Sequence, residues 1–210
     1  KNVRLIEIWG SLALLQAELG DESAVAKIRA QIASVRLRRI GKLQELLAAN
    51  ALDKEIRIDL AIELNDLANG QASTTPADIE QQRVWHHDLL KLFGDKPDVD
   101  ALDDLEADLV SRGYGNLGWC DILLKKPESA ILNCRVALEY SPDANWIVQN
   151  LALAHLYNGQ FQKSLSIYAI LLAGAEDKNR FRQDVKSEFE NLRGRGLDHS
   201  DINKLLKELE

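Results

Sequence analysis

Hydrophobic residues recur every three or four positions along most of this chain, which is the spacing of helices that bury one face. Residues 3–19 carry one such stripe, Gly20-Asp21 interrupts it, and a second stripe continues to Leu47. A short break between two helical stretches predicts that the two helices lie antiparallel. The pattern therefore predicts a helical hairpin over residues 1–50.

Residues 51–110 give a less regular pattern. The stretch EIRIDLAIEL alternates like a strand, but its leucines also fit a helix and no other segment predicts a strand, so we predict a helix over 54–69. Segment 69–76 combines a glycine, small polar residues and a proline, which is typical of a loop. A further helix is predicted over 77–93, and Asp98 is expected to cap the next one.

The second half of the chain repeats itself at an interval of 34 residues, so that residues 111–144 align with residues 145–178. The alignment places Leu117-Gly118 on Leu151-Ala152 and keeps the helical spacing of both halves in register. Paired helical patterns with this period are typical of solenoids built from stacked helix hairpins. We therefore predict an all-α protein that is more regular in its second half.

These two units resemble the tetratricopeptide repeat (TPR) family. The first unit carries the family's Leu-Gly pair, small residue, later alanine and closing proline: Leu117, Gly118, Ala130, Ala137 and Pro142. The second unit carries the corresponding pair, the turn glycine and the aromatic position, but has a glutamate in place of the proline: Leu151, Ala152, Gly159, Tyr168 and Glu176. The resemblance implies a right-handed α-solenoid of antiparallel helix pairs, ending in capping helices.

The patterns together predict four regions. They are an N-terminal helical hairpin (1–50), an irregular helical region with the loop 69–76 (51–110), two repeats (111–178) and a C-terminal pair of capping helices (179–210).

One motif points to a different class of protein. Gly113–Gly118 has the form G-x-G-x-x-G, and Glu139 follows near the place of the ribose-binding acid of dinucleotide-binding enzymes. That fingerprint requires a buried strand before its first glycine, whereas the preceding residues are charged and have a helical period. We interpret the motif as the start of a repeat, and a nucleotide-dependent enzyme is left as an alternative.

Composition narrows the function classes. The formal net charge of −7 disfavours general nucleic-acid binding, which depends on neutralising phosphates. No apolar run approaches the roughly 18 residues of a membrane span, and no signal peptide begins the chain, so we expect a cytoplasmic protein without a membrane partner. Cys120 and Cys134 lack metal spacing and are expected to be buried and reduced. No catalytic motif is evident, so we expect no enzyme activity, cofactor or metal.

The chain contains no methionine, which suggests a piece of a longer protein. This observation supports a second interpretation, in which the chain is the regulatory or recruitment arm of a larger bacterial effector, for example a protease, whose active site lies outside these residues.

The TPR resemblance implies a binding site, because the first helix of each pair in that family lines a concave groove that holds a peptide or helix of a partner. The positions that it assigns to the groove are Arg112, Asn116, Trp119, Trp146, Gln149, Asn150, Leu153, Tyr157, Arg180 and Gln183. Asparagine amides both donate and accept hydrogen bonds, and aromatic rings supply rigid contact area. We expect a protein–protein interaction module that acts as a scaffold or adaptor; Trp119 could instead pack in the core.

Two further possibilities concern the N-terminal region. A basic cluster, made up of Arg36, Arg38, Arg39 and Lys42, could hold a phosphate or an acidic partner, although such a run more often forms the solvated face of a helix. Helices within residues 1–50 could also pair between two copies of the chain, which would make the protein a homo-oligomer.

Overall fold

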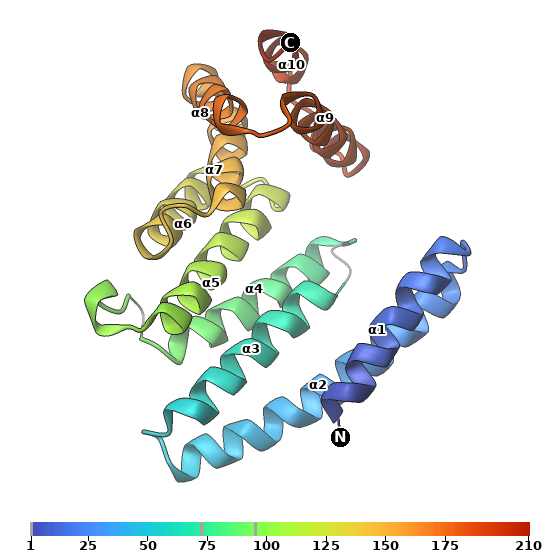
Figure 1. The fold of residues 1–210 in the computed structure, drawn as a ribbon, viewed down its shortest axis with the longest axis vertical. Coiled ribbons are helices and arrows are strands. Elements are labelled where there is room, and N and C mark those ends of the chain that lie inside the picture. Colours follow the sequence, from blue (N-terminus) through green and yellow to red (C-terminus); the bar gives the residue numbers. More distant parts are fainter. Residues whose placement is uncertain (1, 72–73, 95) are drawn as a thin grey trace. The chain divides into compact units, whose positions relative to one another are not determined.

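The computed structural model describes residues 2–71, 74–94 and 96–210, the side chains of residues 2–5 excepted. This described part is 80% helical, contains no strand, and folds into ten α-helices that pack mostly against their neighbours in sequence (Figure 1). The all-α prediction is therefore confirmed. The helices are α1 (Asn2–Glu18), α2 (Glu22–Ala49), α3 (Lys54–Gly70), α4 (Pro76–Lys91), α5 (Asp104–Leu123), α6 (Pro127–Tyr140), α7 (Asn145–Tyr157), α8 (Phe161–Gly174), α9 (Lys178–Gly194) and α10 (Ile202–Glu208), with one 3-10 turn, η1 (Val99–Ala101).

The helices form two compact units, residues 1–96 (unit 1) and 97–210 (unit 2). Of the divisions predicted from the sequence, 50/51 falls between α2 and α3, 110/111 falls inside α5, and 178/179 falls at the first residue of α9.

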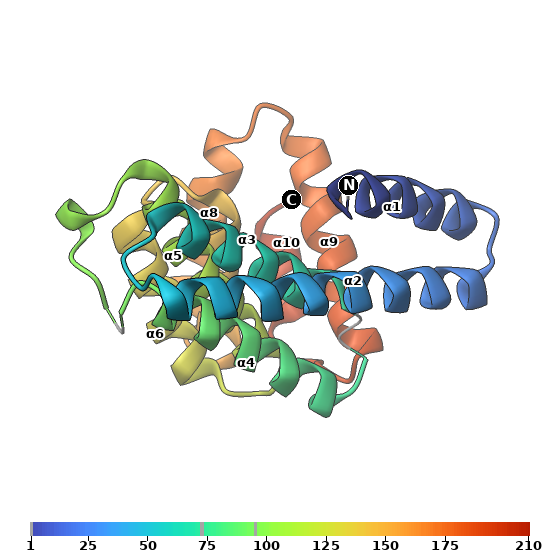
Figure 2. The ribbon, with the colours of Figure 1, turned by 90° about the horizontal axis from the view of Figure 1, so that it is seen from below.

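Unit 1 begins with the predicted hairpin, in which α1 runs antiparallel along the first half of α2 (Figure 2). Each of α2, α3 and α4 packs against the one before it. Side-chain caps mark the helix starts: Asp21 accepts from the backbone N–H of Ala24, and Thr75 forms a capping box with Asp78. The ambiguous stretch is helical, as predicted; residues 72 and 73 of the predicted loop lie outside the described residues.

Unit 2 contains two hairpins, α5–α6 and α7–α8, that share one backbone register. The C-terminal ends of α5 and α7 are 34 residues apart, and so are both the first and the last residues of α6 and α8. This offset equals the period of the sequence repeat. At the turns, Lys126 N donates to Asp121 O and Gln160 N donates to His155 O, each at 2.8 Å. In addition, α5 packs against α7, so alternate helices meet side by side.

The start of α5 differs from the prediction. Asp98 caps only the short turn η1, and the chain then leaves the helical conformation at Leu102. Asp103 forms a capping box with Glu106 and begins α5 afresh. Leu105, in the first turn of α5, is 46% exposed, whereas Leu109 one turn later is buried.

The G-x-G-x-x-G stretch is helical throughout, inside α5, so these residues do not form a phosphate-binding loop. Its glycines allow close approach of neighbouring helices. A Cβ on Gly118 would lie 2.5 Å from Cys134 Sγ on α6, and one on Gly115 would lie 2.5 Å from the Trp146 ring on α7. Gly118 therefore lies at a close crossing of α5 and α6.

The last two helices form as predicted and complete unit 2. The Phe189 ring on α9 lies 6.1 Å from the Tyr168 ring on α8, and α10 packs against both α8 and α9. Among the residues that the structure describes, no helix has the length and apolar character needed to cross a bilayer.

Candidate functional site

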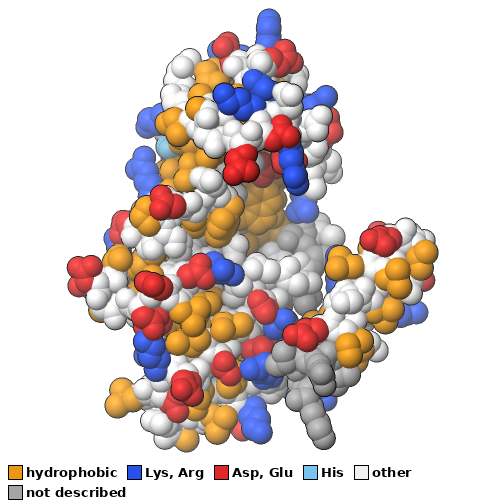
Figure 3. Space-filling model, viewed as in Figure 1, with side chains coloured by type: hydrophobic (Ala, Val, Ile, Leu, Met, Phe, Trp, Pro, Cys, Tyr) orange, Lys and Arg blue, Asp and Glu red, His pale blue; other side chains and the backbone are white. Residues whose placement is uncertain are grey.

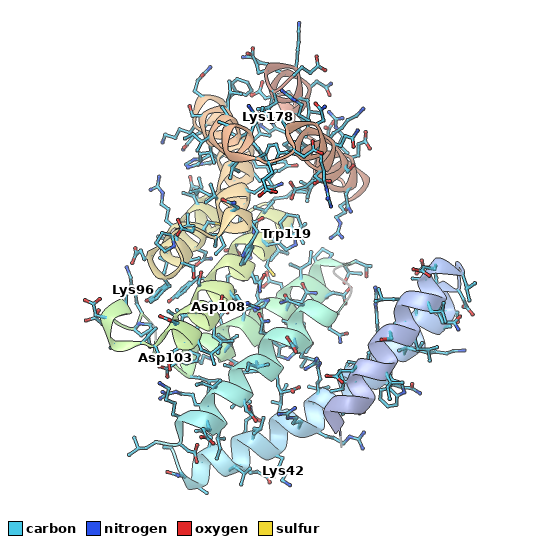
Figure 4. The ribbon with its side chains drawn as sticks, in the orientation of Figure 1. Lys42, Lys96, Asp103, Asp108, Trp119 and Lys178 are labelled. Atoms are coloured by element: carbon cyan, nitrogen blue, oxygen red, sulfur yellow. The ribbon has the colours of Figure 1, made fainter. Side chains whose placement is uncertain are left out.

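The predicted groove residues of α5 share one face of that helix. Arg112 is exposed, and its Nε lies 2.8 Å from Asp108 Oδ2, an ion pair one turn away. Asn116 and Trp119 are half-buried, and Trp119 lies toward the C-terminal end of α5 (Figure 4). The exposed ion pair between Arg112 and Asp108 contributes little to stability, so the Arg112 guanidinium can exchange Asp108 for a carboxylate of a partner at small cost. The face therefore offers a cation, an amide and a ring.

Trp146 extends this face onto α7. Its ring lies over Gly115, where any larger residue would displace it, and yet 42% of the residue remains exposed. The missing side chain at position 115 lets the indole rest on the backbone of α5. Trp146 is therefore a rigid apolar surface held between two helices, the type of residue that dominates binding energy at interfaces.

Three further predicted residues of α7 are not available in the same way. Asn150 is 7% exposed and Leu153 is completely buried, so both belong to the packing of unit 2. Gln149 donates from Nε2 to Glu188 Oε2 on α9 at 2.6 Å, so its amide is already engaged. The burial of Asn150 could not be read from the sequence, because it shares the helical spacing of the exposed positions.

Tyr157 lies at the wall of a cavity of about 250 Å³ near the end of this face. Its hydroxyl donates to Leu197 O at 2.7 Å, and burial, together with the nearby Asp198 carboxylate, raises the pKa of Tyr157 to about 12. The phenol is thus a neutral donor at physiological pH. The cavity is lined by Ile122, Lys125, Pro127, Tyr157, Gly196, Leu197 and Asp198. This volume is below the usual range of small-molecule sites and suits a single side chain.

Polar side chains lie between α9 and the hairpin α7–α8, where Gln149 of α7 meets Glu188 of α9. Burial raises the pKa of the Glu188 carboxyl, while the hydrogen bond from Gln149 acts in the opposite direction. The Tyr168 hydroxyl is fully buried and finds no hydrogen-bond partner among the described residues, and burial raises its pKa well above the ordinary value. Glu188 was not predicted from the sequence, because it is one of many charged residues on α9 and only the structure shows that it is half-buried.

The predicted residues of α9 remain at the surface. Arg180 and Gln183 are exposed, and the closest carboxylate oxygen of Asp184 lies 4.0 Å from Arg180 Nε, at the outer limit of an ion pair. Basic and acidic side chains alternate over α9 and α10, at the top of Figure 3. This end of unit 2 therefore carries charges of both signs.

The basic cluster of α2 is largely neutralised by α3. Arg36 pairs with Glu63 at 2.8 Å and with Asp66 at 2.9 Å, and Arg39 pairs with Glu63 at 2.8 Å and with Asp59 at 3.2 Å. Because the Glu63 side chain is only 4% exposed, these pairs fix how α2 lies on α3. Arg38 and Lys42 are exposed and do not by themselves form a basic patch.

The remaining candidate chemistry is sparse. No group of three histidine, cysteine or carboxylate side chains gathers in the described ranges in a way that could hold a metal ion. Cys120 and Cys134 are buried thiols outside any disulfide, as predicted, and burial raises the pKa of Cys134 to about 12, so it is protonated. Burial also lowers the pKa of His86 to about 4, with a smaller contribution from His87.

Compared with profiles of known protein families and with the sequences of curated proteins, the chain shows no significant match.

Proposed function

We propose that unit 2 is a TPR-like protein–protein interaction module, which holds a peptide or a helix of a partner on the face formed by α5, α7 and α9. The observation that carries this proposal is the shared register of the two hairpins. Two hairpins offset by 34 residues, with alternate helices in contact, generate a continuous surface from the first helix of each pair.

The residues proposed to bind are the exposed and half-buried members of that face: Arg112, Asn116, Trp119, Trp146, Arg180 and Gln183. Trp146 would supply the apolar anchor, because its ring is fixed over Gly115 and loses little conformational entropy on binding. Arg112 would bind an acidic group of the partner, and the cavity beside Tyr157 would accept one side chain. Asn150 and Leu153 act in this proposal as supports of the face.

Affinity capture with the full chain tests the proposal. The wild type is compared with Asn116→Ala/Arg180→Ala, whose two sites lie on the proposed face. A matched control carries Leu132→Ala/Ile170→Ala, two large exposed residues of α6 and α8 that lie off the face. Circular dichroism verifies that each variant is folded.

The expected result is a protein retained by the wild type and the control but lost by the face variant. Equal retention by all three would contradict the placement of the site on α5, α7 and α9.

A further inference from the structure

The helix α1 exposes an unusual amount of apolar surface. Ile8, Leu12, Leu15 and Leu19 are 59%, 40%, 51% and 71% exposed. Hydrophobic side chains are spread over the surface of α1 in Figure 3. Leu19 N donates to Leu15 O at 3.1 Å, so the helical turn continues through the last of them. These four residues, called here the α1 stripe, amount to roughly 400 Å² of apolar surface, as large as the largest patch of a typical monomer.

The spacing of the α1 stripe is that of a coiled-coil seam. Its members are separated by four, three and four residues, so they occupy the alternating a and d positions of a heptad. Within unit 1, α1 packs against α2, and the half-buried residues of α1, which include Trp9 and Ala13, lie outside the stripe. The seam therefore has the pattern of a helix–helix contact but is left uncovered by unit 1.

We propose that the occupant of the α1 stripe is the α1 stripe of a second copy of this chain, paired antiparallel about a twofold axis. In that arrangement Leu12 faces Leu15 of the second copy and Ile8 faces Leu19, so that every layer of the seam is aliphatic. This pairing is independent of the proposed function, because α1 belongs to unit 1 and the proposed binding face belongs to unit 2.

Area and charge both favour a second copy. A standard interface buries about 800 Å² per partner, so the α1 stripe would form its apolar centre and the flanking surface of α1 and α2 its rim. The heptad positions beside the stripe hold Trp9, Ser11, Gln16 and Glu18, of which only Glu18 is charged, and antiparallel pairing places Glu18 beside Ser11 of the second copy. A lipid surface is a poorer match, because α1 carries one arginine and no lysine.

Sedimentation equilibrium of the full chain tests the pairing. We expect the wild type to form dimers reversibly at micromolar concentration, and Leu12→Glu/Leu15→Glu to weaken dimerisation at least about tenfold. Leu14→Glu is the matched control, since Leu14 lies on the same helix, is 70% exposed and is outside the stripe; this variant should dimerise like the wild type. All three positions are substantially exposed, so circular dichroism should show unchanged helix content.

The orientation is tested by exchanging charges. With antiparallel helices, Leu12→Glu/Leu15→Lys sets a glutamate against a lysine in both central layers, and this variant should dimerise more tightly than Leu12→Glu/Leu15→Glu. With parallel helices, both double variants would place like charges together and would be equally weak, which would overturn the antiparallel pairing.

The pairing itself is overturned by a wild type that stays monomeric up to about 100 µM, a concentration at which a contact of this size should be populated. It is also overturned by a dimer that the stripe variant leaves intact. Binding of a monomeric wild type to phosphatidylglycerol vesicles, lost in the stripe variant, would assign the stripe to a membrane surface instead.

Discussion

The hairpins α5–α6 and α7–α8 repeat the same backbone with different side chains. Where α5 crosses α6, Gly118 meets the small Cys134; at the equivalent crossing of α7 and α8, Ala152 and the large Tyr168 take these places. All four residues are buried. The two hairpins thus fill the same crossing with different distributions of volume, which shows that the 34-residue register fixes where helices meet but not how each crossing is packed.

The turns differ in the same way. Lys125 and Gly159 occupy equivalent positions and both have a positive φ, of 59° and 70°. Glycine adopts this conformation without strain, whereas lysine does so at a cost. The first hairpin therefore tolerates a local penalty that the second avoids, and its lysine lies at the wall of the cavity beside Tyr157.

The largest effect is expected from removing the ring of Tyr168 at the crossing of α7 and α8. Tyr168→Ala should reduce the free energy of unfolding by about 3–5 kcal/mol, because it removes a fully buried ring that packs against Phe189. Tyr168→Phe is the control: it removes a hydroxyl without a described partner and should be neutral or stabilising by about 1 kcal/mol. Urea denaturation measures both, and a large loss in the phenylalanine variant would mean that the hydroxyl has an essential partner.

The pH dependence of stability compares the buried histidines of the two units, beginning with His86 in unit 1. The pKa of His86 is about 4 in the folded state, against 6.5 for an ordinary histidine, so the unfolded state binds the proton more readily between these values. Neutral His86 makes its full contribution to the free energy of unfolding above pH 6.5. This contribution falls by about 3 kcal/mol as the pH drops to 4.

Urea midpoints measured from pH 4 to 8 should therefore fall on the acidic side, and His86→Leu should flatten that slope. His155 in unit 2 should contribute in the same direction, since burial lowers its pKa as well, while a hydrogen bond with Gln160 opposes this shift. An unchanged slope in His86→Leu would show that His86 is not the group responsible.

A smaller effect is expected at the crossing of α5 and α6, where Gly118 meets Cys134. Gly118→Ala brings a methyl group against Cys134 Sγ and should cost about 1–2 kcal/mol, after the gain in helix propensity is counted. In the background of Cys134→Ala the same substitution should cost less, by about 1 kcal/mol or more, because the obstructing sulfur is gone. A double-mutant cycle measures this coupling, and additive effects would contradict the close contact.

The smallest effect is expected at the turns. Lys125→Gly should stabilise the protein by about 0.5–1 kcal/mol, and Gly159→Ala should destabilise it by about 1 kcal/mol, because only glycine is unstrained at positive φ. Thermal unfolding of the two variants checks the opposite signs. Shifts of the same sign would show that the two turns are not equivalent.

Much of the fold could be predicted from the sequence, because helical spacing and capping residues act locally. The hairpin of residues 1–50, the helix at 54–69 and the final two helices all form where the pattern placed them. The start of α5 was missed, since Asp98 and Asp103 are both good capping residues and only the capping box with Glu106 decides between them.

The candidate site was less predictable. The TPR resemblance assigned Leu153 and Arg112 to the same groove, but burial depends on which helix covers each position, and Leu153 is fully enclosed. The pairing of Arg36 and Arg39 with carboxylates of α3 likewise depends on packing between helices. The assignment of the exposed groove residues to partner binding stays a prediction.

Site-specific photo-crosslinking tests the central claim most directly. A photoreactive amino acid is placed in the full chain at Arg112, on the proposed face of α5, or at Leu132, an exposed residue of α6 in the same hairpin. The account predicts a discrete cross-linked partner from position 112 and none from position 132. Equal products from both positions, or a product from position 132 alone, would contradict it.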